Sequence, residues 1–235
     1  KLNFFVLENS DIYVSHALNK AISMATGSFI LRLDIHCKYP KNYISSLVNY
    51  IQDKPHVGNV GAMCNTLPAD NSIVSRAIAL SLSSRIGVGL SSFRIGNVND
   101  VVKVDTVPFG CWRRELFNDI GLFDIDLIRN QDDELNQRII KHGLEIHLLP
   151  YISVDYFGRS NFLSLIKMFY QYGLFKPLVN KKIGKITTYR QLAPVLLIFI
   201  IVSNLFFYLY DSYASTLIFF FLSLIYLLVP IFFIR

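Results

Sequence analysis

Two long runs without a charged residue lie at the end of the chain, residues 193–210 and 213–234. Each run is long enough to cross a hydrocarbon core of about 30 Å as an α-helix. Because only Asp211 and Ser212 separate the runs, a transmembrane hairpin is a better interpretation than two helices buried in a soluble core. The chain is therefore expected to consist of a more polar part followed by a membrane-anchored end.

The charges that flank these runs predict which way the hairpin faces. The chain has a formal net charge of +6. The turn between the runs contains no basic residue, whereas five precede the first run: Lys176, Lys181, Lys182, Lys185 and Arg190. Since basic loops stay on the cytoplasmic side, we expect the polar part on the cytoplasmic side of the cell membrane. The basic excess then faces an anionic membrane surface, and no arginine-rich or base-stacking motif indicates a nucleic-acid partner.

The cysteines give little sign of covalent cross-linking. Cys37, Cys64 and Cys111 are odd in number and far apart, without metal-type or redox-type spacing. We expect reduced and mostly buried thiols, in agreement with a cytoplasmic domain.

Apolar strands and amphipathic helices alternate through the polar part, which predicts an α/β fold. The expected strands are residues 3–7, 29–33, 57–63, 101–107 and 145–149. The expected helices begin at Ser15, Pro40, Ser72 and Asn130, with a short one that ends at Gly121. The glycine-rich and serine-rich residues 87–97 are predicted to form a mobile flap over a site. Because residues 3–7 already look like a buried strand, we expect an upstream part of the domain to be missing.

One predicted strand ends in residues that can hold a ligand. In open α/β sheets, ligands lie outside the carboxyl ends of the strands, which puts Asp34, Ile35 and His36 at a binding edge. Asp34 and His36 share one face of an extended segment, so a carboxylate and an imidazole can bind one divalent ion. A hydrogen-bonded turn without metal is the alternative.

Three adjacent carboxylates, Asp132, Asp133 and Glu134, open a later predicted helix in this basic chain. Their mutual repulsion has to be compensated by a helix N-terminus, by a cation or by a reacting proton. In the capping interpretation Asn130 is the N-cap, the acids meet the helix dipole and Glu134 pairs with Arg138. In the chemical interpretation the acids face a site, and the residues alone leave both interpretations open.

Several blocks in this order resemble the family 2 glycosyltransferases, and within them the branch of the succinoglycan chain-elongating glucosyltransferases. The matching residues are Ser15–Asn19, Ala25–Gly27, Arg32–His36, Tyr39–Pro40, Asn59–Gly61, Asp105–Gly110, Gly121–Asp124 and Asn130–Arg138. The resemblance implies a GT-A fold, which is a mostly parallel sheet flanked by helices.

The resemblance also implies roles at the matching positions. Asp34 corresponds to the first acid of the family's metal and nucleotide motif, and His36 stands where a second acid is usual, so both are expected to hold Mn²⁺ or Mg²⁺. Asp132 corresponds to the general base, with Asp133 as its competitor. Further along, Tyr172, Gly173 and Lys176 look like the motif that follows the catalytic domain.

The remaining candidates concern the two substrates. Asn19, Asp34 and Gly110 are expected to bind the donor, with Gly110 allowing a close backbone approach. Trp112 and Arg159 are expected to bind the acceptor, an indole covering a sugar face and a guanidinium meeting a phosphate. Core packing of Trp112 and a carboxylate-paired Arg159 are the alternatives.

The expected domains are a GT-A domain over residues 1–158, a membrane-interface segment over 159–190 and two transmembrane helices over 191–235. In the middle segment, aromatic and aliphatic residues interleave with lysines, for example Phe162, Leu165 and Lys167. This pattern predicts either a helix in the plane of the membrane interface or an ordinary amphipathic helix packed on the domain.

We interpret the chain as a membrane-bound inverting glycosyltransferase that moves a hexose from a nucleotide sugar, such as a UDP-hexose, to a lipid-linked oligosaccharide in the synthesis of a surface polysaccharide or exopolysaccharide. The alternatives are a polyprenyl-phosphate glycosyltransferase, a metal-dependent phosphoester hydrolase and a non-catalytic membrane-tethered binding module. Each of these functions requires a different arrangement of the Asp34 and Asp132 carboxylates, so the structure of the site can distinguish between them.

Overall fold

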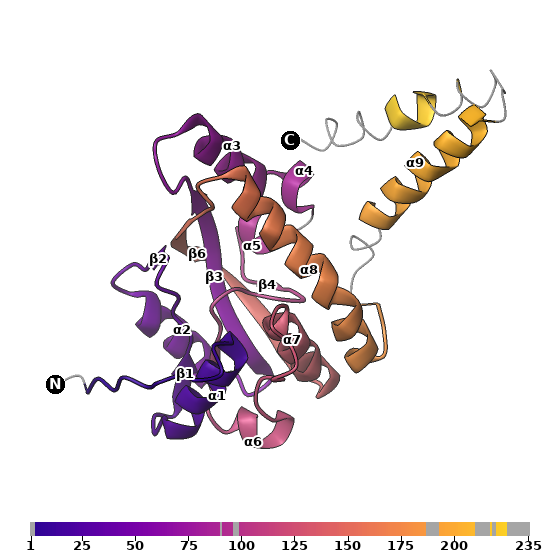
Figure 1. Cartoon of the computed structure of the whole chain (residues 1–235). Helices are drawn as coiled ribbons and strands as arrows, with labels where there is room; N and C mark the ends of the chain where they lie inside the picture. Colours follow the sequence, from indigo (N-terminus) through magenta and orange to yellow (C-terminus); the bar gives the residue numbers. More distant parts are fainter. Residues whose placement is uncertain are drawn as a thin grey trace.

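The structure of the chain is a computed structural model, which describes residues 3–89, 91–95, 99–186, 193–209, 217 and 220–224. A single mixed sheet is flanked by helices on both faces (Figure 1). The strands are β1 Phe29–Leu31, β2 Cys37–Lys38, β3 Val57–Leu67, β4 Val102–Lys103, β5 Cys111–Arg113 and β6 Glu145–Phe157. The helices are α1 Val14–Met24, α2 Tyr43–Gln52, α3 Ile73–Leu82, α4 Arg85–Val88, α5 Ser92–Ile95, α6 Leu116–Ile120, α7 Gln131–Lys141, α8 Phe162–Ile183 and α9 Ala193–Leu209.

The sheet is mixed, whereas a mostly parallel one was predicted. Its order is β1-β5-β3-β6-β2, and β4 also pairs with β6. The long central strands β3 and β6 are parallel from Val57 opposite Glu145 to Leu67 opposite Phe157. The other pairings are antiparallel. The short strands β2 and β5 have too few residues to show a hydrophobic period, so the sequence pattern could not reveal them, while β4 occupies two residues of the strand predicted over 101–107.

Residues 3–7 form no strand, which corrects the prediction for this segment. They have no regular secondary structure, and Phe4, Phe5 and Val6 are 86%, 78% and 100% exposed. Apolar composition alone does not make a strand, because a strand also needs a neighbour for its backbone N–H and C=O groups. Among the described strands, none pairs with this segment.

Two hydrophobic clusters lie on the two faces of the sheet. On one face α2 contributes Tyr43, Leu47 and Ile51, which pack with Val60 of β3. On the other face Leu135 and Ile139 of α7 pack with Ile146 and Leu148 of β6 and with Trp112. Successive side chains of a strand point to opposite faces, so β6 serves both clusters, with Leu149 in the first and Leu148 in the second. The burial fixes α7 on the sheet, and with it the acids of its first turn.

Helix α8 packs on the domain through a smaller third cluster. Its Leu165 and Met168 contact Ile78 and Leu82 of α3. Figure 1 shows α8 crossing beside α7 and α3. The helix is therefore packed on the domain, as expected for an ordinary amphipathic helix, which was one of the two interpretations of this segment.

The structure adds detail to one local prediction and departs from another. Ser15 does not cap the first helix, because α1 begins at Val14 after Tyr13 and Ser15 is buried inside it. The predicted flap contains two short helices, α4 and α5, and serine side chains explain part of this, since Ser84 caps α4. Gly96 and Asn97 of that segment lie outside the described residues.

The first charge-free run is helical, as α9 shows. Most of the second run, together with Arg190 and Asp211, lies outside the described residues. Within the part of the chain that the structure describes, no helix is both long enough and apolar enough to span a membrane. The transmembrane hairpin stays a prediction.

Candidate active site

A cavity of about 690 Å³ lies where the strand end after β1 meets the first turn of α7. Arg32, Asp34 and His36 line one wall, and Gln131, Asp132 and Asp133 line the opposite one. The remaining walls come from five parts of the chain. They are the segment from the end of α3 to α5, the segment before β5, the loop before α7, the end of β6, and α8: Leu82, Gly87–Gly89, Ser91, Phe93, Arg94, Thr106–Phe109, Arg129, Asn130, Tyr156, Arg159, Met168, Phe169 and Tyr172. The two acidic clusters that lie about a hundred residues apart in the sequence thus share one cavity.

Arg32 joins the two acidic clusters directly. Its Nε donates to Asp34 Oδ1 at 2.8 Å and one of its terminal nitrogens donates to Asp34 Oδ2 at 3.1 Å. Its other terminal nitrogen donates to both carboxylate oxygens of Asp132 at 2.7 Å. A planar guanidinium can serve two carboxylates in this way because its donors lie in a fixed fork. Arg32 therefore sets the spacing between Asp34 and Asp132.

Each of the three adjacent carboxylates of α7 has its own cation. Asp132 pairs with Arg32, Asp133 with Lys176 of α8, and Glu134 with Arg138. Asn130 stands at the N-cap position in a left-handed conformation with φ of 63°, but its side chain makes no capping bond. The predicted pair of Glu134 and Arg138 is confirmed. Asp132 and Asp133 instead line the cavity and bind cations from other elements.

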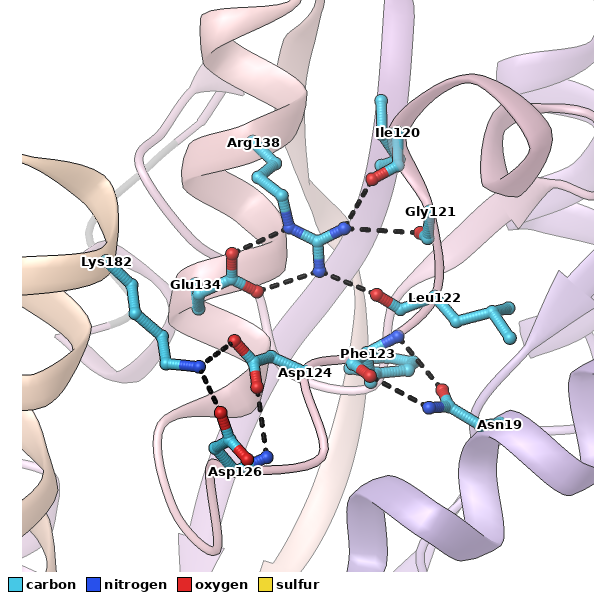
Figure 2. A network of polar contacts seen from close by, with 10 residues as sticks. All are labelled: Asn19, Ile120, Gly121, Leu122, Phe123, Asp124, Asp126, Glu134, Arg138 and Lys182. Carbon is cyan, nitrogen blue, oxygen red and sulfur yellow. Dashed lines mark hydrogen bonds and ion pairs between the residues drawn. The ribbon is translucent and has the colours of Figure 1, made fainter.

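A polar network holds the start of α7 in place (Figure 2). The guanidinium of Arg138 binds both oxygens of Glu134 at 2.7 Å and also donates to the carbonyls of Ile120 and Leu122. Lys182 of α8 donates to Asp124 Oδ2 at 2.5 Å and to Asp126 Oδ2 at 2.7 Å. The loop before α7 is thus bound from two sides, by its own helix and by α8.

The electrostatics of the cavity favour a carboxylate with raised proton affinity at Asp132. Burial raises the pKa of Asp132, and the negative charges of Asp34 and Asp133 act in the same direction, while Arg32 opposes them. The pKa of His36 is lowered by burial and by the charges of Arg159 and Arg32, against the pull of Asp34. A neutral imidazole therefore faces the cavity beside an acid at neutral pH.

The residues at the strand end suit a divalent cation. Asp34 and His36 belong to a turn, closed by a hydrogen bond from the Cys37 N–H to the Asp34 carbonyl, and not to the extended segment that was predicted. Both nevertheless line the same cavity. An ionised carboxylate keeps free lone pairs beside Arg32, and a metal ligand has to be a neutral imidazole. These two donors fit Mn²⁺ somewhat better than Mg²⁺, which prefers oxygen ligands.

Further arginines give the cavity a cationic lining. Arg94, Arg129 and Arg159 all line it. Arg94 lies 5.2 Å from the ring centroid of Tyr156, within cation–π distance. The Nε of Arg159 is buried and has no hydrogen-bond partner. A buried donor without a partner is uncommon, so this guanidinium is placed to receive an anionic ligand.

Three of the residues predicted from the sequence lie elsewhere. Asn19 forms two hydrogen bonds with the backbone of Phe123, so its side chain is used within the fold (Figure 2). Trp112 is 3% exposed and packs edge-on against Phe117 and Phe123 in the core. A Cβ on Gly110 would lie 2.3 Å from Asn59 Oδ1, which accounts for a glycine here by packing. These three do not line the cavity.

The sequence interpretation named Arg159 but overlooked the other arginines of the cavity, Arg32, Arg94 and Arg129. Arg32 lies two residues before Asp34, and this spacing alone could have suggested that their side chains share a face. Arg94 and Arg129 carried no comparable signal, because they reach the cavity from segments whose positions depend on the whole fold.

Glycosyl transferase family 2 matches residues 2–121, just over half of the 235 residues. The match includes Asp34 and His36, whereas the acidic start of α7 lies beyond it.

Among curated proteins, the succinoglycan biosynthesis protein ExoA of Rhizobium meliloti (strain 1021) is 28% identical over 169 residues, which is 71% of this chain. The chain spans 50% of the length of that relative. Among solved structures, a crystal structure of GalNAc-T7 with UDP, GalNAc and Mn²⁺ has a TM-score of 0.46 and 15% identity, over 63% of this chain and 31% of its own.

Proposed function

Because the chain belongs to glycosyl transferase family 2, we propose that its cavity transfers a hexose from a nucleotide sugar to an acceptor hydroxyl, with inversion at the anomeric carbon. The observation that carries this proposal is the single cavity in which Arg32 binds both Asp34 and Asp132. It brings a cation-binding strand end and a base of raised proton affinity to opposite walls of one space.

The cavity has the size and charge for a nucleotide sugar. A volume of about 690 Å³ lies within the range of small-molecule sites, about 300–1,000 Å³. A diphosphate is an anion, and Arg159 and Arg94 give the lining fixed positive charge. A divalent ion held by Asp34 and His36 supplies electrostatic stabilisation of the leaving diphosphate when bound.

Asp132 is proposed as the general base. It lies on the wall opposite Asp34, at the start of a helix that is fixed by burial of Leu135 and Ile139. An ionised Asp132 takes the proton from the acceptor hydroxyl as that oxygen attacks the anomeric carbon, while the bond to the diphosphate breaks. Burial favours this step, because it raises the affinity of the carboxylate for that proton. Asp133, which pairs with Lys176 of α8, is the competing candidate.

The acceptor is proposed to be a lipid-linked saccharide at the membrane surface. Helix α8 lines the cavity with Phe169 and Tyr172, and the same helix carries exposed apolar side chains and lysines. An acceptor with its lipid tail in a bilayer can then reach the cavity along α8. The relative named for succinoglycan biosynthesis supports a role in the synthesis of an exported polysaccharide.

The competing functions fit the geometry less well. A hydrolase would need Asp34, His36, Asp132 and Asp133 as one ligand cluster, but among the described residues no three of these four bring their ligand atoms within 4.8 Å of one another. A binding module in which the acids only cap a helix does not explain why Asp132 binds an arginine from another element.

The proposal is tested by Asp132→Asn in the membrane-embedded chain, with Mn²⁺ and a panel of nucleotide sugars. Removal of a general base should lower the rate of transfer about 10²- to 10⁴-fold, measured as nucleoside diphosphate release with lipid-linked acceptor. Donor affinity, measured by calorimetry, should change by no more than a few fold. Asp119→Asn, an exchange of an exposed acid on α6, is the matched control and should leave both values unchanged.

Other outcomes would reject the proposal. Wild-type turnover in the Asp132→Asn protein would remove this residue from the role of base. Release of sugar phosphate in the absence of any acceptor would indicate the hydrolase. A product with one sugar on a bare lipid phosphate would identify a polyprenyl-phosphate acceptor instead of an oligosaccharide.

A further inference from the structure

A second group of metal-binding side chains lies at the starts of the two central strands. His56 precedes β3, and Glu145 and His147 open β6. One potential ligand atom from each residue lies within 4.8 Å of the other two. A hydrogen bond from the Glu145 N–H to the His56 carbonyl, 2.8 Å long, fixes the two backbones next to each other.

This group is separate from the candidate active site. The cavity is lined at the other end of β6 by Tyr156, eleven residues after Glu145. The residues of β3 that pair with these two, Val57 and Thr66, are nine residues apart, which at about 3.3 Å per residue amounts to roughly 30 Å. Chemistry in the cavity therefore makes no use of His56, Glu145 or His147.

The ligand atoms already lie close to the positions that a tetrahedrally coordinated metal ion requires. Bonds of about 2.0–2.2 Å to two imidazoles and a carboxylate place the ligand atoms about 3.3 Å apart. His147 Nε2 lies 2.8 Å from Glu145 Oε2, and the His56 and His147 ring centroids are 5.9 Å apart. His56 is exposed, so its ring can rotate toward the other two without disturbing the core.

Tyr50 contacts the ring nitrogen of His147 that faces away from Glu145. Its hydroxyl lies 2.8 Å from His147 Nδ1. If Nδ1 carries the proton and donates to Tyr50, then Nε2 is free to bind an ion on the Glu145 side. Such a partner on the second nitrogen is the usual way in which a ligating histidine is oriented.

Lys103 is the charged neighbour that competes for the acid. Its Nζ lies 2.9 Å from Glu145 Oε1, while Oε2 faces His147. The two oxygens of this carboxylate thus serve different partners, and one remains directed at the histidine. Lys54 lies over the Tyr50 ring, 4.2 Å from its centroid, and does not contact the acid.

We propose that His56, Glu145 and His147 bind Zn²⁺, or another transition-metal ion that prefers imidazole, with water as the fourth ligand. Two imidazoles and one carboxylate suit Zn²⁺ better than Mg²⁺ or Ca²⁺, which prefer oxygen ligands. The ion would connect the residue before β3 to the first residues of β6. Its expected role is to fasten the starts of the two central strands.

The test is a calorimetric titration of the full chain with Zn²⁺ alone. A second titration uses Co²⁺ alone, because the visible absorption of bound Co²⁺ distinguishes four-coordinate from six-coordinate sites. His56→Ala and His147→Ala should each weaken Zn²⁺ binding more than 100-fold. Tyr50→Phe keeps all three ligands and should weaken it about 10- to 100-fold, the range for loss of an outer-shell partner. His142→Ala removes an exposed histidine outside the group and should leave the affinity unchanged.

Circular dichroism of each variant distinguishes loss of the site from loss of the fold, and His56→Ala serves where His147→Ala does not fold. His36→Ala should retain the site, which separates it from any ion in the cavity. Failure of the wild-type chain to bind Zn²⁺, or equal affinity in the wild-type, His56→Ala and His147→Ala chains, would overturn the proposal and leave these residues as a hydrogen-bonded cluster.

Discussion

Arg32 is the residue on which the geometry of the cavity depends most. Its side chain is 12% exposed and binds two carboxylates on opposite walls. Without it, Asp34 and Asp132 would face each other as two uncompensated anions in a partly buried space. The pKa of Asp132 reflects this balance, because burial raises it and Arg32 lowers it.

Replacing Arg32 should therefore move the pH dependence of activity. In Arg32→Gln the opposing charge is lost, so the pKa of Asp132 rises further. Because the base acts in its ionised form, activity should disappear at a higher pH on the acid side than in the wild-type enzyme. We also expect kcat/KM to fall about 10²-fold at any pH, since the two walls lose their spacing. The measurement is a pH profile of initial rates.

Arg32→Lys separates charge from geometry in this experiment. Lysine keeps the positive charge but cannot donate in a fork, so the acid limb should stay near its wild-type pH while the rate falls. Arg114→Gln, an exchange of an exposed arginine, should alter neither. An acid limb at the same pH in the Arg32→Gln and wild-type proteins would show that Arg32 does not control the ionisation of Asp132.

At the scale of single residues, the sequence identified the acidic side chains of the cavity better than the basic ones. Residue type, position at element ends and the family resemblance had singled out Asp34, His36, Asp132, Asp133 and Arg159, and all five line the cavity. The cations around them were missed, since an arginine or lysine reaches its partner over a long side chain from anywhere in the fold.

At the scale of elements, α8 is fastened to the domain by polar contacts as well as apolar ones. Lys176 binds Asp133, and Lys182 binds Asp124 and Asp126 in the loop before α7 (Figure 2). The pKa of Asp124 lies below its ordinary value. Burial raises this pKa, but the hydrogen bonds from Lys182 and from the Asp126 N–H together lower it by more than burial raises it.

Lys182→Met should loosen the end of α8 in a pH-dependent way. The lysine is 27% exposed, so the loss should be about 1 kcal/mol or less in the free energy of unfolding at pH 7. A depressed carboxyl pKa stabilises the fold above its ordinary value of 3.8 and stops doing so as the pH falls through the depressed pKa. The difference between variant and wild type should thus shrink below about pH 4. Urea unfolding across this range measures it; a difference that persists in acid would point to packing instead.

A close contact between β3 and a wall of the cavity gives a second test for elements. A Cβ on Gly61 would lie 2.5 Å from Val107 Cβ, and Val107 and Pro108 line the cavity. Gly61→Ala should therefore push this wall outward, destabilising the fold by about 1–3 kcal/mol and raising the KM for the donor. Gly173→Ala in α8 meets no atom within 4 Å and should stabilise its helix slightly. Chemical denaturation and donor titration of both variants test this; equal stability of Gly61→Ala and wild type would contradict it.

Long elements with a clear hydrophobic period were predicted from the sequence, whereas the short strands β2 and β5 were not. Helices α2, α3 and α7 appear close to their predicted positions, and β3 and β6 extend beyond theirs. The two-residue strand β2 depends on backbone pairing with β6, which no local pattern encodes. The same limit explains why residues 3–7, apolar but unpaired, were mistaken for a strand.

At the scale of the whole molecule, α8 links the cavity to an exposed apolar surface. Phe169 and Tyr172 line the cavity, while Leu163, Ile166 and Tyr170 are exposed at helical spacing. An unpartnered apolar stripe with neighbouring lysines is typical of a helix that also lies on a membrane. Packing on the domain and contact with lipid are therefore compatible properties of one helix.

The native thiols allow this contact to be measured at single positions. Burial raises the pKa of Cys37 to about 11 and that of Cys111 to about 12, and Cys64 is shifted in the same direction. Since the thiolate is the nucleophile, these cysteines should react slowly at neutral pH, and an introduced exposed cysteine should be labelled first.

We predict that position 166 touches lipid and that position 44 does not. Ile166 of α8 and Ile44 of α2 are similarly exposed, 48% and 53%, which makes Ile166→Cys and Ile44→Cys a matched pair. Each variant is labelled with a small fluorophore and reconstituted in nanodiscs that contain anionic and brominated lipids. Bromine quenches only at contact distance, so emission from position 166 should fall and shift to the blue, while emission from position 44 should not change. Because both variants carry the same apolar end of the chain, anchoring by residues 193–235 cannot produce a difference between them. Equal quenching at the two positions would contradict a lipid-facing α8, and the acceptor would then have to reach the cavity by another route.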